Sequence, residues 1–122
     1  MSICFIILPS SYIDTILYPS DEFSKPVISA YIFGSRDEQP AISATKAFIG
    51  HTLGASGTIE AIVCADSICH NTVHGNICGT IIDGINYTPE TRSLRVDRAV
   101  SASFGFGGHN AAIMLERYEK NN

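Results

Sequence analysis

The sequence predicts an α/β domain in which a mixed sheet carries a layer of helices. Short apolar runs typical of strands alternate with two helical segments, and two more such runs close the chain around a glycine-rich loop. Strands that alternate with helices and end in a hairpin favour a sheet covered by helices. With 122 residues, 45% of them hydrophobic and 16% charged, the chain can bury one core. We therefore expect a single domain over residues 1–122.

The first part of the chain contains three expected strands and one helix. The continuous apolar run 3–8 is typical of a strand buried on both faces, and 12–17 is a second β-prone run. The acidic pair 21–22 is followed by an apolar stripe at helical spacing, which predicts a helix that ends before Gly34. A short strand is expected over 41–45.

The segment from Leu53 or Ser56 to His70 gives the clearest helix prediction. It is apolar almost all round, and such a helix is normally enclosed by other layers. Residues 71–84 carry few periodic signals, and 86–88 is expected to be a short strand. The last two expected strands, flanking the glycine-rich loop, are 99–104 and 111–118.

Charge and cysteine content narrow the classes of partner. A net charge of −4 argues against nucleic acid, and the apolar N-terminal run is too short to span a membrane. Four cysteines without a secretory signal indicate reduced thiols in a cytoplasmic protein. The basic residues Arg92, Arg95 and Arg98 are more typical of a solvated strand edge than of a docking patch.

Two motifs carry the chemical information. The first is K-x3-G-H-x-L-G-A-x-G-x-x-E over residues 46–60, and the second is S-F-G-F-G-G-H-N over residues 103–110. We expect Lys46 to end a strand and Gly50 to form a tight turn that presents His51 near a helix start. The helix-end potential there favours a neutral imidazole. Each motif also has a plainer interpretation, a structural histidine and a glycine-rich β-turn.

In this order and spacing the two motifs resemble the C-terminal half of the β-ketoacyl-acyl-carrier-protein synthases. These are the condensing enzymes of fatty-acid and polyketide assembly. The resemblance covers residues 42–115. It implies one half of the thiolase-like fold, in which two such halves sandwich a central helix layer. The apolar helix ending at His70 would belong to that layer.

The resemblance also implies roles for individual residues. His51 would match one of two histidines that donate hydrogen bonds to the enolate formed when malonyl-carrier loses carbon dioxide. Lys46 and Glu60 would match the pair that orients this site, and the Phe106 amide would match an oxyanion donor. The positions that would bind substrate all lie in the second motif: Phe104, Phe106, Gly107, Gly108 and Asn110.

Three departures from the family pattern bear on activity. The first active-site histidine of the family has no counterpart in residues 13–22. Ala102 stands where an asparagine is common, and His109 replaces a small residue. No cysteine lies in the strand-to-helix elbow that presents the family's nucleophile; the cysteines present are Cys4, Cys64, Cys69 and Cys78. Without a nucleophile, the chain alone is expected not to condense anything.

One further pattern could indicate a zinc site, because His70 and His74 are spaced i, i+4 and thiols flank them. The spacing matches no closed zinc module, and Cys64 and Cys69 fit the apolar helix pattern. We therefore expect no metal and no cofactor.

The sequence thus leads to a β-ketoacyl-synthase-like protein that is truncated and not catalytic alone. The leading hypothesis is an accessory subunit that binds another condensing-enzyme subunit or forms a homodimer, with acyl carrier protein as a further candidate partner. The alternative is one half of a split condensing enzyme, in which His51, Lys46 and the Phe106 amide act on a partner's cysteine. A third hypothesis is a remnant that folds as a homodimer and has no function.

Overall fold

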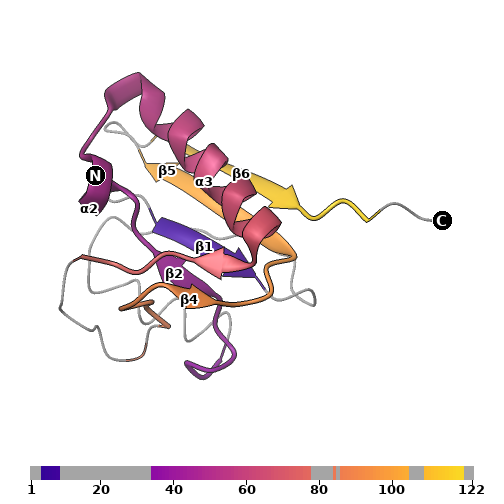
Figure 1. Cartoon of the computed structure of the whole chain (residues 1–122). Coiled ribbons are helices and arrows are strands. Elements are labelled where there is room, and N and C mark those ends of the chain that lie inside the picture. Colours follow the sequence, from indigo (N-terminus) through magenta and orange to yellow (C-terminus); the bar gives the residue numbers. More distant parts are fainter. Residues whose placement is uncertain (1–3, 9–33, 78–83, 85, 105–108, 120–122) are drawn as a thin grey trace.

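The computed structural model describes residues 4–8, 34–77, 84, 86–104 and 109–119. Within them, a long helix lies across one face of a four-stranded sheet (Figure 1). The α/β class with a helix layer is therefore confirmed. The expected strand 12–17 and the expected helix after residues 21–22 lie outside the described residues.

The sheet is built from both ends of the chain. Its strands are β1 (Cys4–Leu8), β2 (Ala41–Ser43), β5 (Arg98–Phe104) and β6 (Asn110–Glu116), in the order β2-β1-β5-β6. Each neighbouring pair is antiparallel, and β1 lies between β2 and β5. Parallel pairing among the described residues is limited to an isolated bridge between Ile42 and Tyr87. The expected strand 86–88 is therefore a single bridge.

The main helix follows its prediction closely. Helix α3 (Ser56–His70) is preceded by a 3-10 turn, η1 (Leu53–Ala55). One stripe of the helix is buried: Ser56, Glu60, Cys64, Ser67 and Ile68. The side chain of Ile62, on another face, is 63% exposed. The described layers thus cover one side of a helix whose sequence is apolar on nearly all sides.

The C-terminal end of α3 is tied to the end of the sheet. Asn71 ends the helix in the left-handed conformation, with φ of 52°, as a helix C-terminus often requires. Its Oδ1 accepts hydrogen bonds from the Val96 N–H at 3.2 Å and from Arg117 Nη2 at 2.6 Å. Arg117, which follows β6, also donates to the carbonyl of Ile68. A cation beside the last carbonyls of a helix is favourable.

The position of Lys46 differs from the prediction. Lys46 was expected to end a strand, but β2 ends at Ser43 and Lys46 begins the short helix α2 (Lys46–Ile49). Thr45 already has helical dihedral angles, and its carbonyl accepts a hydrogen bond from the Phe48 N–H at 3.0 Å. The strand is shorter than predicted because the chain turns into this helical turn before the lysine.

The core lies between α3 and the sheet. Its buried members come from β2, α3, the following segments and β5: Ala41, Cys64, Ile68, Val73, Val96 and Ala99. A second, two-stranded sheet, which the sequence did not indicate, pairs β3 (Thr72–Val73) with β4 (Arg92–Ser93). No helix among the described residues is long and apolar enough to cross a membrane.

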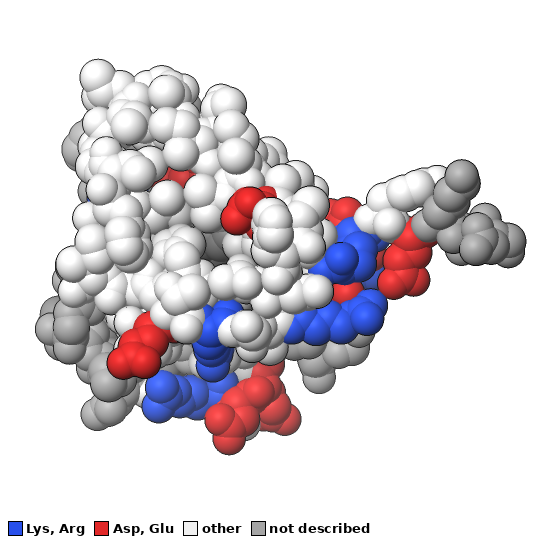
Figure 2. Space-filling view, viewed as in Figure 1, with Lys and Arg blue, Asp and Glu red and all other residues white. Residues whose placement is uncertain are grey.

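Basic and acidic side chains are interspersed on the face shown in Figure 2 and do not form a patch of one sign. Arg95 lies 2.9 Å from Asp97 and 3.2 Å from Glu119, and Arg98 lies 2.7 Å from Glu116. Arg95 and Arg98 are therefore both paired with carboxylates in the described part of the chain.

Buried amides replace strand pairing next to β2. Asn76, 8% exposed, accepts from the Ala44 N–H at 2.6 Å and donates to the carbonyls of Thr88 at 2.7 Å and Ile42 at 3.2 Å. One side chain therefore joins β2 to the segment around Thr88, which would otherwise contact β2 mainly through the bridge at Tyr87.

We expect Asn76→Ala to lower the free energy of unfolding by about 2–3 kcal/mol, because buried backbone groups would lose their partner. Urea denaturation would measure the change. Ile77→Ala is the matched control, since the Ile77 side chain is 59% exposed and its removal should change little. Equal, small effects of the two substitutions would contradict the role given to the Asn76 amide.

Candidate functional site

The first motif places its lysine and glutamate together. Lys46 Nζ lies 2.8 Å from Glu60 Oε1, although the two residues belong to different helices. The Glu60 side chain is 1% exposed and that of Lys46 is 15% exposed. Glu60 Oε2 has no hydrogen-bond partner among the described residues. A carboxylate this deeply buried is costly unless a cation accompanies it, so Lys46 is essential to its burial.

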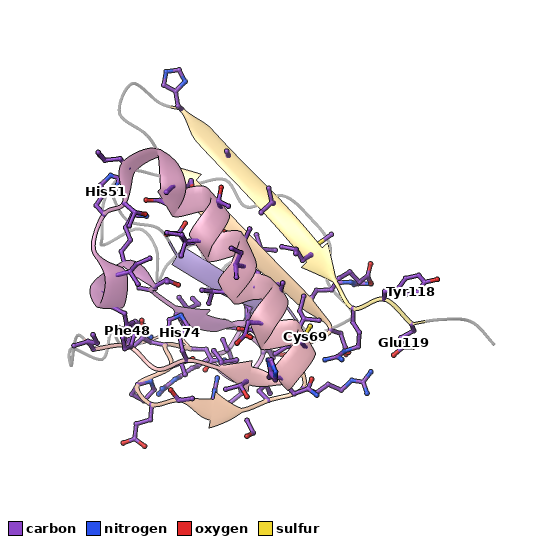
Figure 3. The ribbon with its side chains drawn as sticks, turned by 45° about the horizontal axis from the view of Figure 1, so that its top comes forward. Phe48, His51, Cys69, His74, Tyr118 and Glu119 are labelled. Carbon is purple, nitrogen blue, oxygen red and sulfur yellow. The ribbon has the colours of Figure 1, made fainter. Side chains whose placement is uncertain are left out.

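His51 lies between the two helices, on a turn that follows Gly50. Gly50 has φ of +70°, a conformation that favours glycine. The Leu53 N–H donates to His51 Nδ1 at 3.0 Å, and Ser56 Oγ lies 3.4 Å from the same nitrogen. Because Nδ1 accepts, the neutral ring carries its proton on Nε2. The residue is exposed, so this donor is available to a ligand (Figure 3).

The second motif is described at its two ends. Phe104 ends β5 and pairs in register with Asn110, the first residue of β6, so the two strands form the expected hairpin. Phe106, Gly107 and Gly108 lie outside the described residues. The roles expected for them, and for Phe104 and Asn110 in substrate binding, stay predictions.

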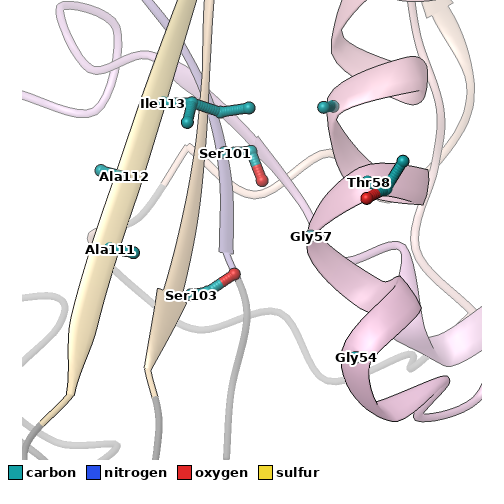
Figure 4. A pocket seen from close by; sticks show the side chains of 9 residues that line it. Gly54, Gly57, Thr58, Ser101, Ser103, Ala111, Ala112 and Ile113 are labelled. Carbon is teal, nitrogen blue, oxygen red and sulfur yellow. The ribbon is translucent and has the colours of Figure 1, made fainter.

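A groove of about 400 Å³ separates the start of α3 from the β5–β6 hairpin (Figure 4). The described residues that line it have small side chains, apart from one isoleucine: Gly54, Gly57, Thr58, Ala61, Ser101, Ser103, Ala111, Ala112 and Ile113. A Cβ atom added to Gly54 or Gly57 would meet nothing within 4 Å. Packing within the described chain therefore does not require glycine at either position.

The cysteines do not form a nucleophilic or metal site in the described part of the chain. Cys64 is fully buried in the core. Burial raises the pKa of its thiol to about 12, and the negative charge of Glu60 acts in the same direction. Cys69 is exposed near the end of α3. No group of three possible metal ligands occurs among the described residues, and Cys78 lies outside them.

The two histidines considered as zinc ligands have different partners. His70 lies 3.0 Å from Asp66 on the surface of α3. His74 instead reaches back to the region of Lys46: its Nε2 lies 3.1 Å from Thr45 Oγ1, and its ring packs edge-to-face against Phe48. No local sequence pattern marks this cluster, because its contacts join positions about thirty residues apart.

The described part of the site combines a buried lysine–glutamate pair, a turn histidine with its Nε2–H available, and the two paired strands on either side of the second motif. On an α/β helix-and-sheet scaffold, this arrangement fits the resemblance of the two motifs to the C-terminal half of the condensing enzymes. Comparison with known proteins agrees. Residues 27–79 match the family model described as "Beta-ketoacyl synthase, C-terminal domain", which includes the first motif and ends before the second.

Curated relatives give the same result. 3-Oxoacyl-[acyl-carrier-protein] synthase 1 of Escherichia coli (strain K12) is 40% identical over 90 residues, which is 70% of this chain and 22% of that enzyme. Synthase 2 of Synechocystis is 34% identical over 105 residues, 83% of this chain and 25% of that enzyme. The chloroplastic synthase II of Arabidopsis thaliana is 38% identical over 95 residues, which is 74% of this chain and 17% of that enzyme.

The chain is therefore similar to the C-terminal domain of the β-ketoacyl synthases, as its motifs predicted, and this domain has the thiolase-like fold. It spans between 17% and 25% of the length of these three relatives.

We expect loss of the lysine of this ion pair to destabilise the fold more than loss of the glutamate. Glu60→Ala leaves Lys46 unpaired but partly able to reach water, and should cost about 1–3 kcal/mol of unfolding free energy. Lys46→Met leaves a buried carboxylate without a cation and should cost about 3–5 kcal/mol. The double variant should be less destabilised than Lys46→Met alone. Chemical denaturation of the three variants measures this order, and a melting temperature unchanged by either single substitution would contradict it.

The two described thiols of α3 should differ in reactivity. At pH 8 we expect iodoacetamide to modify Cys69 and to leave Cys64 unmodified in the folded protein, because Cys64 is buried and remains protonated. Mass spectrometry of the peptides separates the two positions. Since folding raises the pKa of Cys64, its stabilising contribution is complete below pH 9 and is lost as the pH rises from 9 towards 12. Rapid modification of Cys64 under native conditions would contradict this assignment.

Proposed function

We propose that this chain supplies the histidine- and lysine-bearing half of a β-ketoacyl-acyl-carrier-protein synthase site. The reaction would be a decarboxylative Claisen condensation completed by a thiol nucleophile from another part of the enzyme. One observation carries the proposal: the buried Lys46–Glu60 pair lies in the same motif as His51, whose Nδ1 is occupied and whose Nε2–H is therefore a donor.

The chemistry assigns a clear task to that donor. In such a condensation a cysteine thiolate takes the acyl group from its carrier, and malonyl-carrier loses carbon dioxide to give an enolate. The enolate carbon then attacks the acyl thioester, and the thiolate leaves. A neutral imidazole that donates through Nε2 stabilises the negative oxygen of the enolate without giving up its proton. The turn after Gly50 and the Leu53 amide hold His51 in that tautomer.

Neither of the thiols described on α3 suits the role of nucleophile. Cys64 is buried and protonated at neutral pH. Cys69 lies thirteen residues after Ser56 along α3, which places it about 20 Å from the helix start beside His51. The nucleophile would therefore come from a second half of the site.

Exposed apolar side chains mark the face that such a half would cover. Leu53 is 77% exposed, Ile62 63% and Ile113 47%, and they line or adjoin the groove between α3 and the hairpin. Large apolar side chains gathered on one face are typical of an interaction surface. We propose a second condensing-enzyme segment or subunit as the occupant. A homodimer and an acyl carrier protein are the other candidates.

A second candidate function is a non-catalytic accessory subunit with the same partner. The sequence feature that favours it is the missing counterpart of the first active-site histidine in residues 13–22. On this hypothesis the Lys46–Glu60 pair is retained for its contribution to folding, and His51 has no chemical role.

One experiment tests both. The tagged chain would be isolated from its native cell with whatever it binds, and the complex assayed for malonyl-carrier-dependent condensation. The first proposal expects a stoichiometric complex with another condensing-enzyme chain, whose activity falls about 10²–10³-fold in His51→Ala. His70→Ala, an exposed histidine at the other end of α3, is the matched control and should have no effect.

The alternative outcomes separate the candidates. A complex whose activity is the same with wild-type chain and His51→Ala would favour the accessory subunit. A lone monomer or homodimer with no condensing-enzyme partner would exclude both candidates and leave a scaffold without enzymatic function.

A further inference from the structure

The segment His74–Asn76 holds the three residues that precede Lys46. Ser43 Oγ donates a hydrogen bond to the carbonyl of His74, and the Ala44 N–H donates to Asn76 Oδ1 at 2.6 Å. Thr45 Oγ1 lies 3.1 Å from His74 Nε2. Each residue from 43 to 45 therefore has a polar contact with this distant segment.

The ring of His74 has a defined orientation. Its Nδ1 lies 2.7 Å from the carbonyl of Gly75, which can only accept, so Nδ1 carries a proton. In the neutral ring, Nε2 then accepts a hydrogen bond from the Thr45 hydroxyl. The ring centroid also lies 5.4 Å from that of Phe48, at an interplanar angle of 87°, an edge-to-face contact. His74 thus contacts α2 through the residues on both sides of Lys46 (Figure 3).

The segment that carries His74 is itself anchored. The Gly75 N–H donates to Thr91 Oγ1 at 3.1 Å. A Cβ atom at Gly75 would lie 2.8 Å from both Glu90 Cα and the Thr91 nitrogen, so the two backbones are in close contact. The backbone that carries the imidazole is therefore held in place, and the ring can determine the position of the more exposed helix α2.

We infer that His74 is a positioning residue for Lys46. Helix α2 has only four residues, none of them buried, and cannot hold its own orientation. Its fixed points are Thr45, which is buried, and Phe48, and His74 contacts both. With these two contacts in place, α2 directs Lys46 Nζ onto Glu60. Without them, α2 could shift and the ammonium group of Lys46 could move into water. The consequence for catalysis rests on the function proposed above, but the positioning does not.

Acylation of Lys46 tests the inference without any activity assay. The full chain would be treated briefly with acetic anhydride, and the rate at Lys46 followed by peptide mass spectrometry. His74→Phe keeps the ring contact with Phe48 and loses the hydrogen bond, and Thr45→Val loses the same bond from the other side. Loss of one such bond should raise the Lys46 acylation rate about fivefold in both variants. Thr45→Ser, which keeps the hydroxyl, and His70→Ala should react at the wild-type rate.

Cys64 serves as an internal reporter of global opening in the same samples. The inference expects its iodoacetamide modification to stay slow while Lys46 becomes reactive. If both groups became reactive together, His74 would be no more than a contributor to overall stability, and the inference would be wrong. An unchanged Lys46 rate in both folded variants would also overturn it, and Thr45→Val gives the result if His74→Phe does not fold.

Imidazole ¹H–¹⁵N correlation spectra add a second readout. We expect the neutral rings to be opposite tautomers, with the proton on Nδ1 in His74 and on Nε2 in His51. A proton on Nε2 of neutral His74 would contradict the proposed donation from Nδ1 to the Gly75 carbonyl and from the Thr45 hydroxyl to Nε2. Neither the acylation rate nor the spectrum depends on condensation. A negative result for His74 therefore does not bear on the proposed role of His51, and a negative His51→Ala assay does not bear on the positioning of Lys46 by His74.

Discussion

The burial of one carboxylate constrains most of the described structure. Glu60 is 1% exposed on the inner stripe of α3, and its partner Lys46 comes from a separate helical turn. An uncompensated charge at that depth would cost several kcal/mol, so α2 and α3 must keep their relative position for the fold to persist. The turn that joins them carries His51. The geometry of the histidine is thus linked to a stabilising ion pair rather than to the conformation of a free loop.

Polar side chains, more than strand ladders, connect the elements around that pair. Asn76 joins β2 to the region of Thr88, and Asn71 with Arg117 joins the end of α3 to the end of β6. The Asn76 network is buried, and a buried network stabilises only when each member is satisfied, which makes it specific for one arrangement. These polar side chains also explain how the described residues 71–77 and 86–96, which have little hydrophobic periodicity, are held in place.

The described residues supply a hydrogen-bond donor for the proposed reaction but no suitable nucleophile. A donor and its orienting pair lie at one end of α3, while the thiol buried in the middle of the helix is protonated and the exposed thiol lies at the other end. The apolar face beside the groove is on the same side as the donor. A site of this kind needs a second component for both its chemistry and the cover of its surface, and the proposed function assigns both to one partner.

The sequence alone predicted the helix from Ser56 to His70, the closing hairpin and the similarity to the β-ketoacyl synthases. These features depend on local periodicity or on fixed spacing, which a single sequence displays. It also predicted that Lys46 and Glu60 act together, although only through the resemblance. The tertiary structure decided what depends on distant contacts: the place of Lys46 at the start of α2, the small sheet of β3 and β4, and the contact of His74 with Thr45. His74 and Thr45 lie 29 positions apart, and no local pattern records a hydrogen bond across that distance.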